Sequence, residues 1–294
     1  MSSQFKPITL EYQDKFEQAL SACPQCTSDY TFANIWGWTE HYGLELRHGK
    51  DNLIHVRQTK PEIINWAPIG DWLNTDWSKC SLMNTSGTKF TRIPEKLALH
   101  WQDVFGDKLL IEENRDHFDY IYSVPELIEL RGNRFHKKKN LYRQFMKKYD
   151  YEYREITEDC VEEVLEMQLE WYRWQEENNN SAALVAENEA IAKVLKEMDT
   201  IKNLTGGTLR IDNRIIAYTI AEALGDDTVV IHFEKGNTYF KGVYQAINQM
   251  FLENNASDRK FVNREQDLGE PGLRKAKMSY NPVDFMKKYE VAVL

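Results

Sequence analysis

The stretch 227–280 constrains the fold most, because it holds two apolar segments that a helix must connect. An apolar run over 228–233 is followed by a glycine-bearing loop over 234–242 and then by apolar residues at helical spacing. A second short apolar run follows at 260–262. Two parallel strands need a crossover of about a dozen residues, and this order supplies one. The sequence therefore predicts a β-α-β unit here.

A polar loop follows the second strand of this unit, at the carboxyl end where open α/β sheets usually place their ligands. We expect function to lie between this loop and the end of strand 228–233. Acids there can accept a proton or hold an ammonium group, a tyrosine can donate a proton, and arginines can hold anions. The candidate catalytic residues are Glu265, Asp267, Glu234 and Tyr280, and the candidate substrate- or donor-binding residues are Asn263, Arg264, Arg274, Lys277, Lys241, Gly242 and Tyr244.

A purely structural interpretation of this loop stays open. Its charges could pair internally, for example Arg264 with Asp267, because irregular loops often need such hydrogen-bonded networks. His232 lies in an apolar strand, and we interpret it as a satisfied core histidine rather than a base. The chain has no Gly-x-Ser-x-Gly motif, and the spacing of its His, Cys and Glu residues predicts no metal site.

A basic segment at 131–148 is the second distinctive feature. It carries eight Lys or Arg residues and no acid, with apolar residues on one side, which predicts an amphipathic basic helix. Like charges without interleaved carboxylates repel one another, and a bound anion lowers this repulsion. The helix is therefore a candidate surface for phosphates. The alternative is a solvated helix joining two domains. The candidate phosphate- or donor-binding residues of this segment are Arg134, Lys137, Lys138 and Lys139.

Composition limits the partners and the compartment. The net charge is −9, from 46 acidic and 37 basic residues, which argues against attraction of the whole protein to nucleic acid or anionic lipid. The first residues lack signal-peptide features, and no apolar run reaches the ~18 residues that span a bilayer. Four scattered cysteines fit a reducing cytoplasm. The pair Cys23 and Cys26 lacks two further ligands for zinc, and we interpret it as coincidence or packing, with no assigned role.

The remaining pattern predicts two halves of similar order. Residues 150–294 follow β-α-α-β-β-β-α-β-α-β, and the first 125 residues follow the same order more loosely. In the first half we expect helices at 71–80 and 95–105. In the second half we expect a break at 178–181, a helix at 187–198 and a final strand at 289–294.

This order resembles the GNAT (acyl-CoA N-acyltransferase) fold, and its tandem use resembles the Fem peptidoglycan aminoacyltransferases and the C-terminal catalytic part of lysylphosphatidylglycerol synthases. Several motifs look like those of an uncharacterised bacterial family grouped with that synthase domain. The resemblance implies an α+β fold with tandem GNAT-like domains at 1–125 and 150–294, a basic connecting helix at 126–149, and mixed, mostly antiparallel sheets flanked by helices. The motifs are Leu130-Arg-Gly-Asn-Arg-Phe-His-Lys-Lys-Lys-Asn140, Phe233-Glu-Lys-Gly236, Lys241-Gly-Val-Tyr-Gln245, Asn263-Arg-Glu-Gln-Asp-Leu-Gly269, Gly272-Leu-Arg-Lys-Ala-Lys277 and Ser279-Tyr-Asn-Pro282.

One departure from the resemblance concerns the donor. Acetyl-CoA users of this fold carry Gln/Arg-x-x-Gly-x-Gly/Ala, in which small residues let the backbone approach a pyrophosphate. Here Gly242 is followed two residues later by Tyr244, so ordinary coenzyme A binding is not expected. The resemblance implies an acyl- or aminoacyltransferase that moves an aminoacyl group from charged tRNA to an amine or hydroxyl of a small-molecule acceptor. The alternatives are a non-catalytic ligand-binding module and an acyl-CoA-dependent N-acyltransferase with an atypical phosphate loop.

Overall fold

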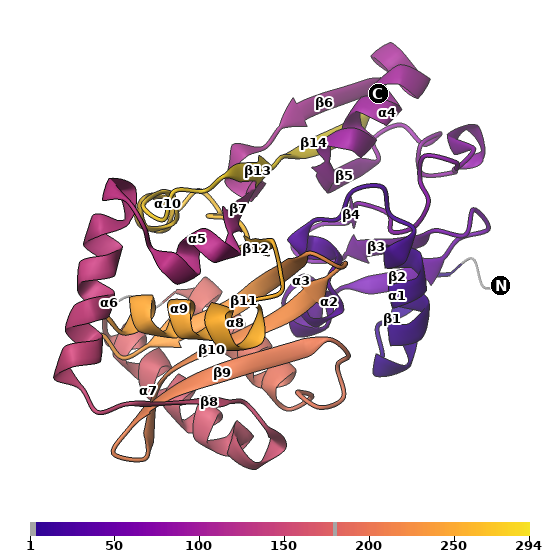
Figure 1. Cartoon of the computed structure of the whole chain (residues 1–294). Coiled ribbons are helices and arrows are strands. Elements are labelled where there is room, and N and C mark those ends of the chain that lie inside the picture. Colours follow the sequence, from indigo (N-terminus) through magenta and orange to yellow (C-terminus); the bar gives the residue numbers. More distant parts are fainter. Residues whose placement is uncertain (1–3, 179–180) are drawn as a thin grey trace. The chain divides into compact units, whose positions relative to one another are not determined.

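The computed structural model describes residues 4–178 and 181–294, which form two compact units (Figure 1). Unit 1 comprises the chain up to Asp119 together with Gln266–Pro271 and Phe285–Leu294, and unit 2 comprises Tyr120–Glu265 and Gly272–Asp284. Each unit is built on a seven-stranded mixed sheet. Among the described residues, no helix is both long and apolar enough to cross a bilayer.

Unit 1 has the strand order β1-β2-β3-β4-β5-β14-β6. Strands β4 and β5 are parallel, and the neighbouring pairs on either side are antiparallel. Its elements are β1 Lys6–Pro7, α1 Gln13–Ser21, α2 Phe32–Gly37, α3 Thr39–Tyr42, β2 Glu45–His48, β3 Ile54–Gln58, β4 Ile64–Trp66, β5 Lys89–Pro94, α4 Glu95–Phe105, β6 Leu109–Glu113 and β14 Lys288–Val293.

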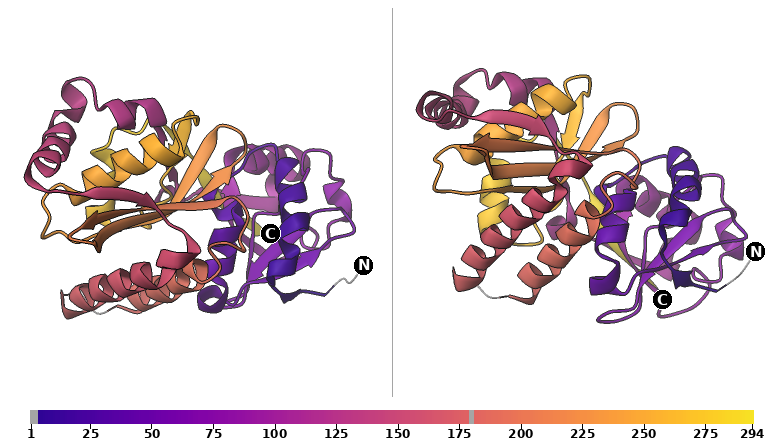
Figure 2. Two further views of the ribbon diagram at one scale, coloured as in Figure 1. Left: turned by 60° about the horizontal axis from the view of Figure 1, so that its bottom comes forward. Right: turned by 90° about the horizontal axis from the view of Figure 1, so that it is seen from below.

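Unit 2 has the strand order β13-β7-β12-β11-β10-β9-β8, with β11 and β12 parallel. Helices α7 and α8 cover one face of this sheet and α9 covers the other (Figure 2). Its elements are β7 Asp119–Ser123, α5 Val124–Glu129, α6 His136–Lys148, β8 Glu152–Glu155, α7 Val161–Asn178, α8 Ala182–Leu195, β9 Leu204–Ile211, β10 Arg214–Leu224, β11 Thr228–Gly236, α9 Val243–Asn255, β12 Phe261–Asn263, α10 Pro271–Met278 and β13 Asp284–Met286.

The two halves of the chain exchange strands. Strand β14, from the end of the chain, lies between β5 and β6 in the sheet of unit 1, and β7, from the end of the first half, lies between β12 and β13 in the sheet of unit 2. The sequence predicts continuous domains at 1–125 and 150–294, whereas the structure divides the chain after Asp119 and assigns β14 to unit 1. The physical reason is that a strand pattern specifies pleat and burial but not the identity of the neighbouring strand.

Several local predictions are confirmed and two need correction. The helix at 95–105 and the parallel β-α-β unit are present. The expected helix at 71–80 is wrong, because this segment is irregular apart from a 3-10 turn at Trp77–Lys79 and is fixed by buried tryptophans. The expected helix at 187–198 begins earlier, at Ala182, because the Ser181 hydroxyl caps it by accepting from Leu184 N at 3.2 Å. Of the expected break at 178–181, residues 179 and 180 lie outside the described residues.

Candidate functional site

The site begins where two parallel strands of unit 2 stop pairing. The register of β11 and β12 runs from Thr228–Phe261 to Val230–Asn263, after which β11 continues to Gly236 paired with β10 on its other side. Arg264 is the first residue beyond β12, and its Nη2 lies 2.8 Å from Oε1 of Glu234 on β11. This ion pair links the two segments beyond the paired part, which is the place where the sequence predicts the site.

Glu234 is an anchored carboxylate. Its side chain is 6% exposed, and its Oε2 accepts from Asn248 Nδ2 at 3.0 Å, a residue of α9. Because Glu234 already holds the Arg264 guanidinium and an amide, its geometry suits a positioning carboxylate better than a proton acceptor. Arg264 therefore pairs with Glu234, and the alternative pairing of Arg264 with Asp267 is not what the structure contains.

The ring of Tyr280 collects two cations. Arg264 Cζ lies 4.7 Å and Lys138 Nζ 3.7 Å from the ring centroid, and Gln245 Nε2 donates to the Tyr280 hydroxyl at 3.0 Å. Burial, together with the nearby charge of Arg264, lowers the pKa of Lys138 to about 8. A lysine with that pKa is mostly protonated at pH 7 and half neutral at about pH 8, so its neutral form can take up a proton at mildly alkaline pH.

Arg264 offers a hydrogen-bond donor that the described part of the chain does not use. Its Nη1 is buried and has no hydrogen-bond partner there. A buried guanidinium N–H without an acceptor is costly, so this donor is available to a bound water or ligand. The backbone around it is held firmly, because Lys277 Nζ donates to Arg264 O at 2.6 Å and Tyr122 OH donates to Lys277 O at 2.9 Å. We call Arg264, Glu234, Tyr280 and Lys138 the Arg264 cluster.

A second group of buried charged side chains surrounds His232 on β11, the strand that also carries Glu234. His232 Nδ1 is 2.8 Å from Glu265 Oε1, and His232 Nε2 is 3.4 Å from Glu222 Oε2. Burial alone would lower the pKa of His232, but the two carboxylates raise it to about 9. His232 is thus protonated at neutral pH, and Glu265 is its hydrogen-bonded partner rather than a free base. Glu265 has a left-handed backbone (φ 56°), and its N–H donates to Asn263 Oδ1 at 2.8 Å.

Sequence reasoning identifies Glu265 but assigns His232 to the core. His232 is indeed buried and partnered, as expected, yet its partner is a predicted site residue. No local sequence signal indicates this pairing, because the register of β11 against β10 shifts at His232 and the strict alternation of faces fails there.

Asp267 has a different environment from Glu265, and it belongs to unit 1. Its side chain is fully buried, its Oδ1 accepts from Gly269 N at 2.9 Å, and its Oδ2 lies 3.4 Å from Arg115 Nη1. These contacts close a turn and satisfy the carboxylate locally. Buried and paired in this way, Asp267 has the geometry of a residue that shapes the loop.

The glycine of the candidate donor loop is tightly packed. Gly242 has a left-handed backbone (φ 91°), and a Cβ there would collide with the Leu141 carbonyl oxygen of α6. Glycine is needed at this position for both reasons. This face of Gly242 is therefore occupied by a helix, and Tyr244 after it is half-buried. Of the other binding candidates, Lys241 is exposed and Arg274 is partly buried.

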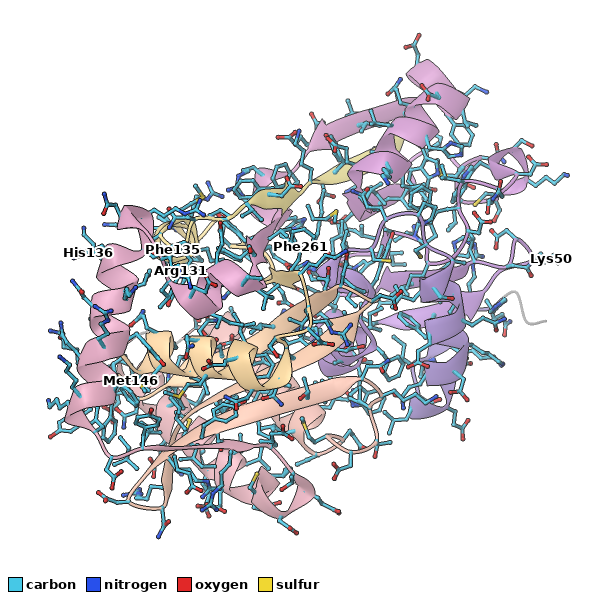
Figure 3. The ribbon with its side chains drawn as sticks, viewed as in Figure 1. Lys50, Arg131, Phe135, His136, Met146 and Phe261 are labelled. Atoms are coloured by element: carbon cyan, nitrogen blue, oxygen red, sulfur yellow. The ribbon has the colours of Figure 1, made fainter. Side chains whose placement is uncertain are left out.

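The predicted basic helix forms as α6, a helix of unit 2 (Figure 3, where His136 and Met146 lie near its two ends). Phe145 is its fully buried residue and packs on α9. The three consecutive lysines differ in their surroundings. Lys137 is exposed, Lys139 is half-buried, and Lys138 contacts the ring of Tyr280. Arg134 pairs with Glu126. The exposed cations of the helix are Lys137, Arg143, Lys147 and Lys148.

The cysteine pair of unit 1 shows packing contacts. Cys23 Sγ accepts from Gly70 N at 3.0 Å, and Cys23 and Cys26 both carry free thiols. Among the described residues, no group of three or more His, Cys, Asp or Glu side chains could hold a metal ion.

The fold is shared with several solved structures. A conserved protein of unknown function from Bacteroides thetaiotaomicron VPI-5482 has 26% identity and a TM-score of 0.88 over 99% of both chains. L-PGS from Bacillus licheniformis has 11% identity and a TM-score of 0.67 over 99% of this chain and 94% of that one. FemX has 8% identity and a TM-score of 0.66 over 99% and 97%. The chain therefore has the α+β fold of tandem GNAT-like acyltransferases, as the sequence predicts.

The family is also shown. The family described as "Phosphatidylglycerol lysyltransferase, C-terminal" matches residues 21–292, and the chain belongs to this family. An uncharacterized protein of Mycoplasmoides gallisepticum is 22% identical over 198 residues, which is 67% of this chain and 63% of the relative. The match thus spans less than two thirds of that curated relative. The comparisons thus show the family and the fold.

Proposed function

We propose that this protein is an aminoacyltransferase that moves an aminoacyl group from charged tRNA to an amine or hydroxyl of a small-molecule acceptor. The observation that carries the proposal is the Arg264 cluster, in which a buried guanidinium N–H without a protein acceptor lies near a lysine whose pKa is about 8. Acyl transfer needs a hydrogen-bond donor that stabilises the oxyanion and a base that takes the proton of the acceptor. The Arg264 N–H and the Lys138 amine can supply these two functions.

The chemistry follows from those two groups. The acceptor nitrogen or oxygen attacks the ester carbonyl carbon of the donor, and neutral Lys138 takes its proton. Arg264 Nη1 donates to the oxygen that becomes negative in the tetrahedral intermediate. The ester C–O bond then breaks, and the proton returns to the leaving ribose hydroxyl from Lys138 or through Tyr280. Glu234 holds the guanidinium in place, and Glu265, positioned by its contact with His232, can hold an acceptor ammonium.

The donor is inferred from what surrounds the site. The packing of α6 on Gly242 disfavours the usual approach of a coenzyme A pyrophosphate, which supports a donor that does not depend on that loop. The exposed cations of α6 provide a surface for tRNA phosphates, and their attraction falls with salt. Charged tRNA is made in the cytoplasm, so we propose that the protein acts there.

The test uses the full chain with tRNA charged with radiolabelled amino acids, and an extract of bacterial lipids and small metabolites as the acceptor pool. We expect label to leave tRNA and to appear in an extractable product. Arg264→Lys keeps the charge but loses the planar fork, and it should abolish most transfer. Acyl-CoA replaces charged tRNA in a parallel reaction. Transfer from acyl-CoA alone would support the atypical N-acyltransferase, and retention of a ligand without transfer from either donor would support the binding module.

A further inference from the structure

A separate pocket in unit 2 has no part in the chemistry above. It has a volume of about 540 Å³ and lies between α7, the start of β10 and the turn after β11. Trp171, Trp174 and Tyr239 line it together with Met167, Ile215 and Glu170. The volume falls in the range of small-molecule sites, which are apolar and aromatic with few polar groups. We propose that this aromatic pocket binds a small organic cation through its alkylammonium group.

Exposed aromatic rings are the first support. Residues 167, 171 and 174 share one face of α7 because they are spaced by four and three. Trp174 is 47% exposed and Tyr239 is 84% exposed. Large rings gathered at one exposed place indicate a binding surface, and their faces attract cations.

The charge at the pocket decides the sign of the ligand. Helix α7 carries six glutamates and one arginine, and one of those glutamates, Glu170, lines the pocket. Glu170 pairs with Arg214 at 3.1 Å, but both side chains are more than half exposed, so the pair is weak and can be shared with an incoming cation. The same acidic charge disfavours a phosphate or a nucleic acid in this pocket.

The protein already contains one example of the proposed contact. Lys235 Nζ lies 4.1 Å from the centroid of the Trp171 ring and 2.8 Å from Oε2 of Glu187. An ammonium between a tryptophan ring and a carboxylate is therefore stable in this part of the fold. Trp174, Tyr239 and Glu170 offer the same combination of ring faces and carboxylate to a ligand.

The test is a titration of the full chain with n-butylammonium at constant ionic strength, followed by tryptophan fluorescence and calorimetry. The uncharged 1-pentanol has a similar shape and is the matched control ligand. We expect saturable binding of butylammonium that is on the order of tenfold tighter than that of pentanol. Trp174→Ala should weaken binding several-fold, Trp174→Phe should retain most of it, and Glu170→Gln should weaken it without unfolding an exposed site. Vesicles of phosphatidylethanolamine form a second arm, which shows whether a lipid headgroup can supply the ammonium.

Two results would overturn the proposal. Equal affinity for pentanol would make the pocket a purely apolar site. Butylammonium binding that Trp174→Ala and Glu170→Gln leave unchanged would place the cation elsewhere. Neither result depends on transfer activity, so the failure of this proposal and the failure of the proposed function are distinguishable.

Discussion

Both units bury charged side chains, but the two charged centres differ in balance and in access. In unit 1, Asp29 and Asp119 face Lys288 and Arg92, and all four are almost fully buried. In unit 2, the Arg264 cluster has two cations at one ring and a single carboxylate, with a buried N–H that lacks an acceptor within the described chain. The first centre is electrically neutral, and the second has an excess positive charge.

The difference fits a structural role for the first centre and the proposed chemical role for the second. Lys288 Nζ lies 2.6 Å from Asp119 Oδ1 and also contacts Asp29, and the space beside Asp29 and Arg92 is too small for a water molecule. Lys288 begins β14 and Asp119 begins β7, which are the two exchanged strands. The centre in unit 1 thus fixes where those strands start. The centre in unit 2 is left incomplete, as expected of a site that a substrate completes.

The largest effect should come from breaking the neutral centre. Lys288→Met leaves two buried carboxylates without their shared cation, and we expect a loss of about 3–5 kcal/mol in the free energy of unfolding. Urea denaturation measures this, with amide hydrogen exchange of β14 as the local readout. The matched control is Lys287→Met, because Lys287 pairs with Glu95 and Glu113 at the surface and should contribute less than ~1 kcal/mol. Equal losses in the two variants would refute a locking role for Lys288.

The next effect concerns activity in the charged centre of unit 2. Lys138→Gln removes the proposed proton acceptor and should lower the transfer rate by about 10²–10⁴-fold. Its stability should change little, because no carboxylate pairs with Lys138 in the contacts described above and its neighbour Arg264 repels it. At a saturating concentration of charged tRNA, Lys137→Gln, one residue earlier and exposed, should leave the rate unchanged. Similar rates in both variants would remove Lys138 from the mechanism.

The pH dependence sharpens the same assignment. Because Lys138 acts in its neutral form and its pKa is about 8, the rate should rise with pH and level off above about pH 8. The rate is measured with one charged tRNA from mildly acidic to alkaline pH. A rate that instead falls as the pH rises through 8 would mean that the protonated lysine is the active form.

A smaller effect is that the stability contributions of the two charged centres should depend on pH in opposite directions. The folded-state pKa of His232 is raised from 6.5 to about 9, so its contribution to stability is present below pH 6.5 and is lost as the pH rises through 9. The stability difference between wild type and His232→Gln should therefore shrink by ~3 kcal/mol or less over that window. In unit 1 the pKa of Asp29 is lowered, since Lys288 and Arg92 outweigh the effect of burial, and its contribution is lost on acidification instead. Unfolding curves at several pH values measure both. A His232→Gln difference that is constant with pH would contradict the ion-paired histidine.

The smallest effect should come from the exposed face of α6. Replacing Lys137 and Lys147 with Glu should weaken tRNA binding several-fold and reduce its salt dependence, because each contact with a phosphate releases counterions. Filter binding between about 50 and about 200 mM salt measures the slope. The matched control reverses two exposed lysines of unit 1, Lys79 and Lys287, to Glu, which gives the same change in net charge away from α6. An unchanged slope in the Glu variant would return α6 to the interpretation of a solvated helix.

Local pattern alone determined much of this protein. The helix at 95–105 and the parallel pair of β11 and β12 follow from apolar spacing, because period and burial are properties of a short segment. The same pattern located the candidate site at the carboxyl end of β12, and it placed Glu234, Arg264 and Tyr280 among the candidates. The basic helix was equally predictable, because a segment with eight cations and no acid is distinctive in the sequence.

Tertiary structure decided which strands become neighbours and which side chains come into contact. Val291 and Val293 are buried in β14 as a strand pattern requires, but nothing local states that β5 and β6 are its neighbours. Lys137 and Lys138 are chemically identical in the sequence, yet only Lys138 loses water against Tyr280 and acquires a pKa of about 8. Burial and distance create these differences, and both depend on residues far away in the chain. A sequence fixes which groups are available, whereas their protonation and pairing are set by the surroundings that folding brings to them.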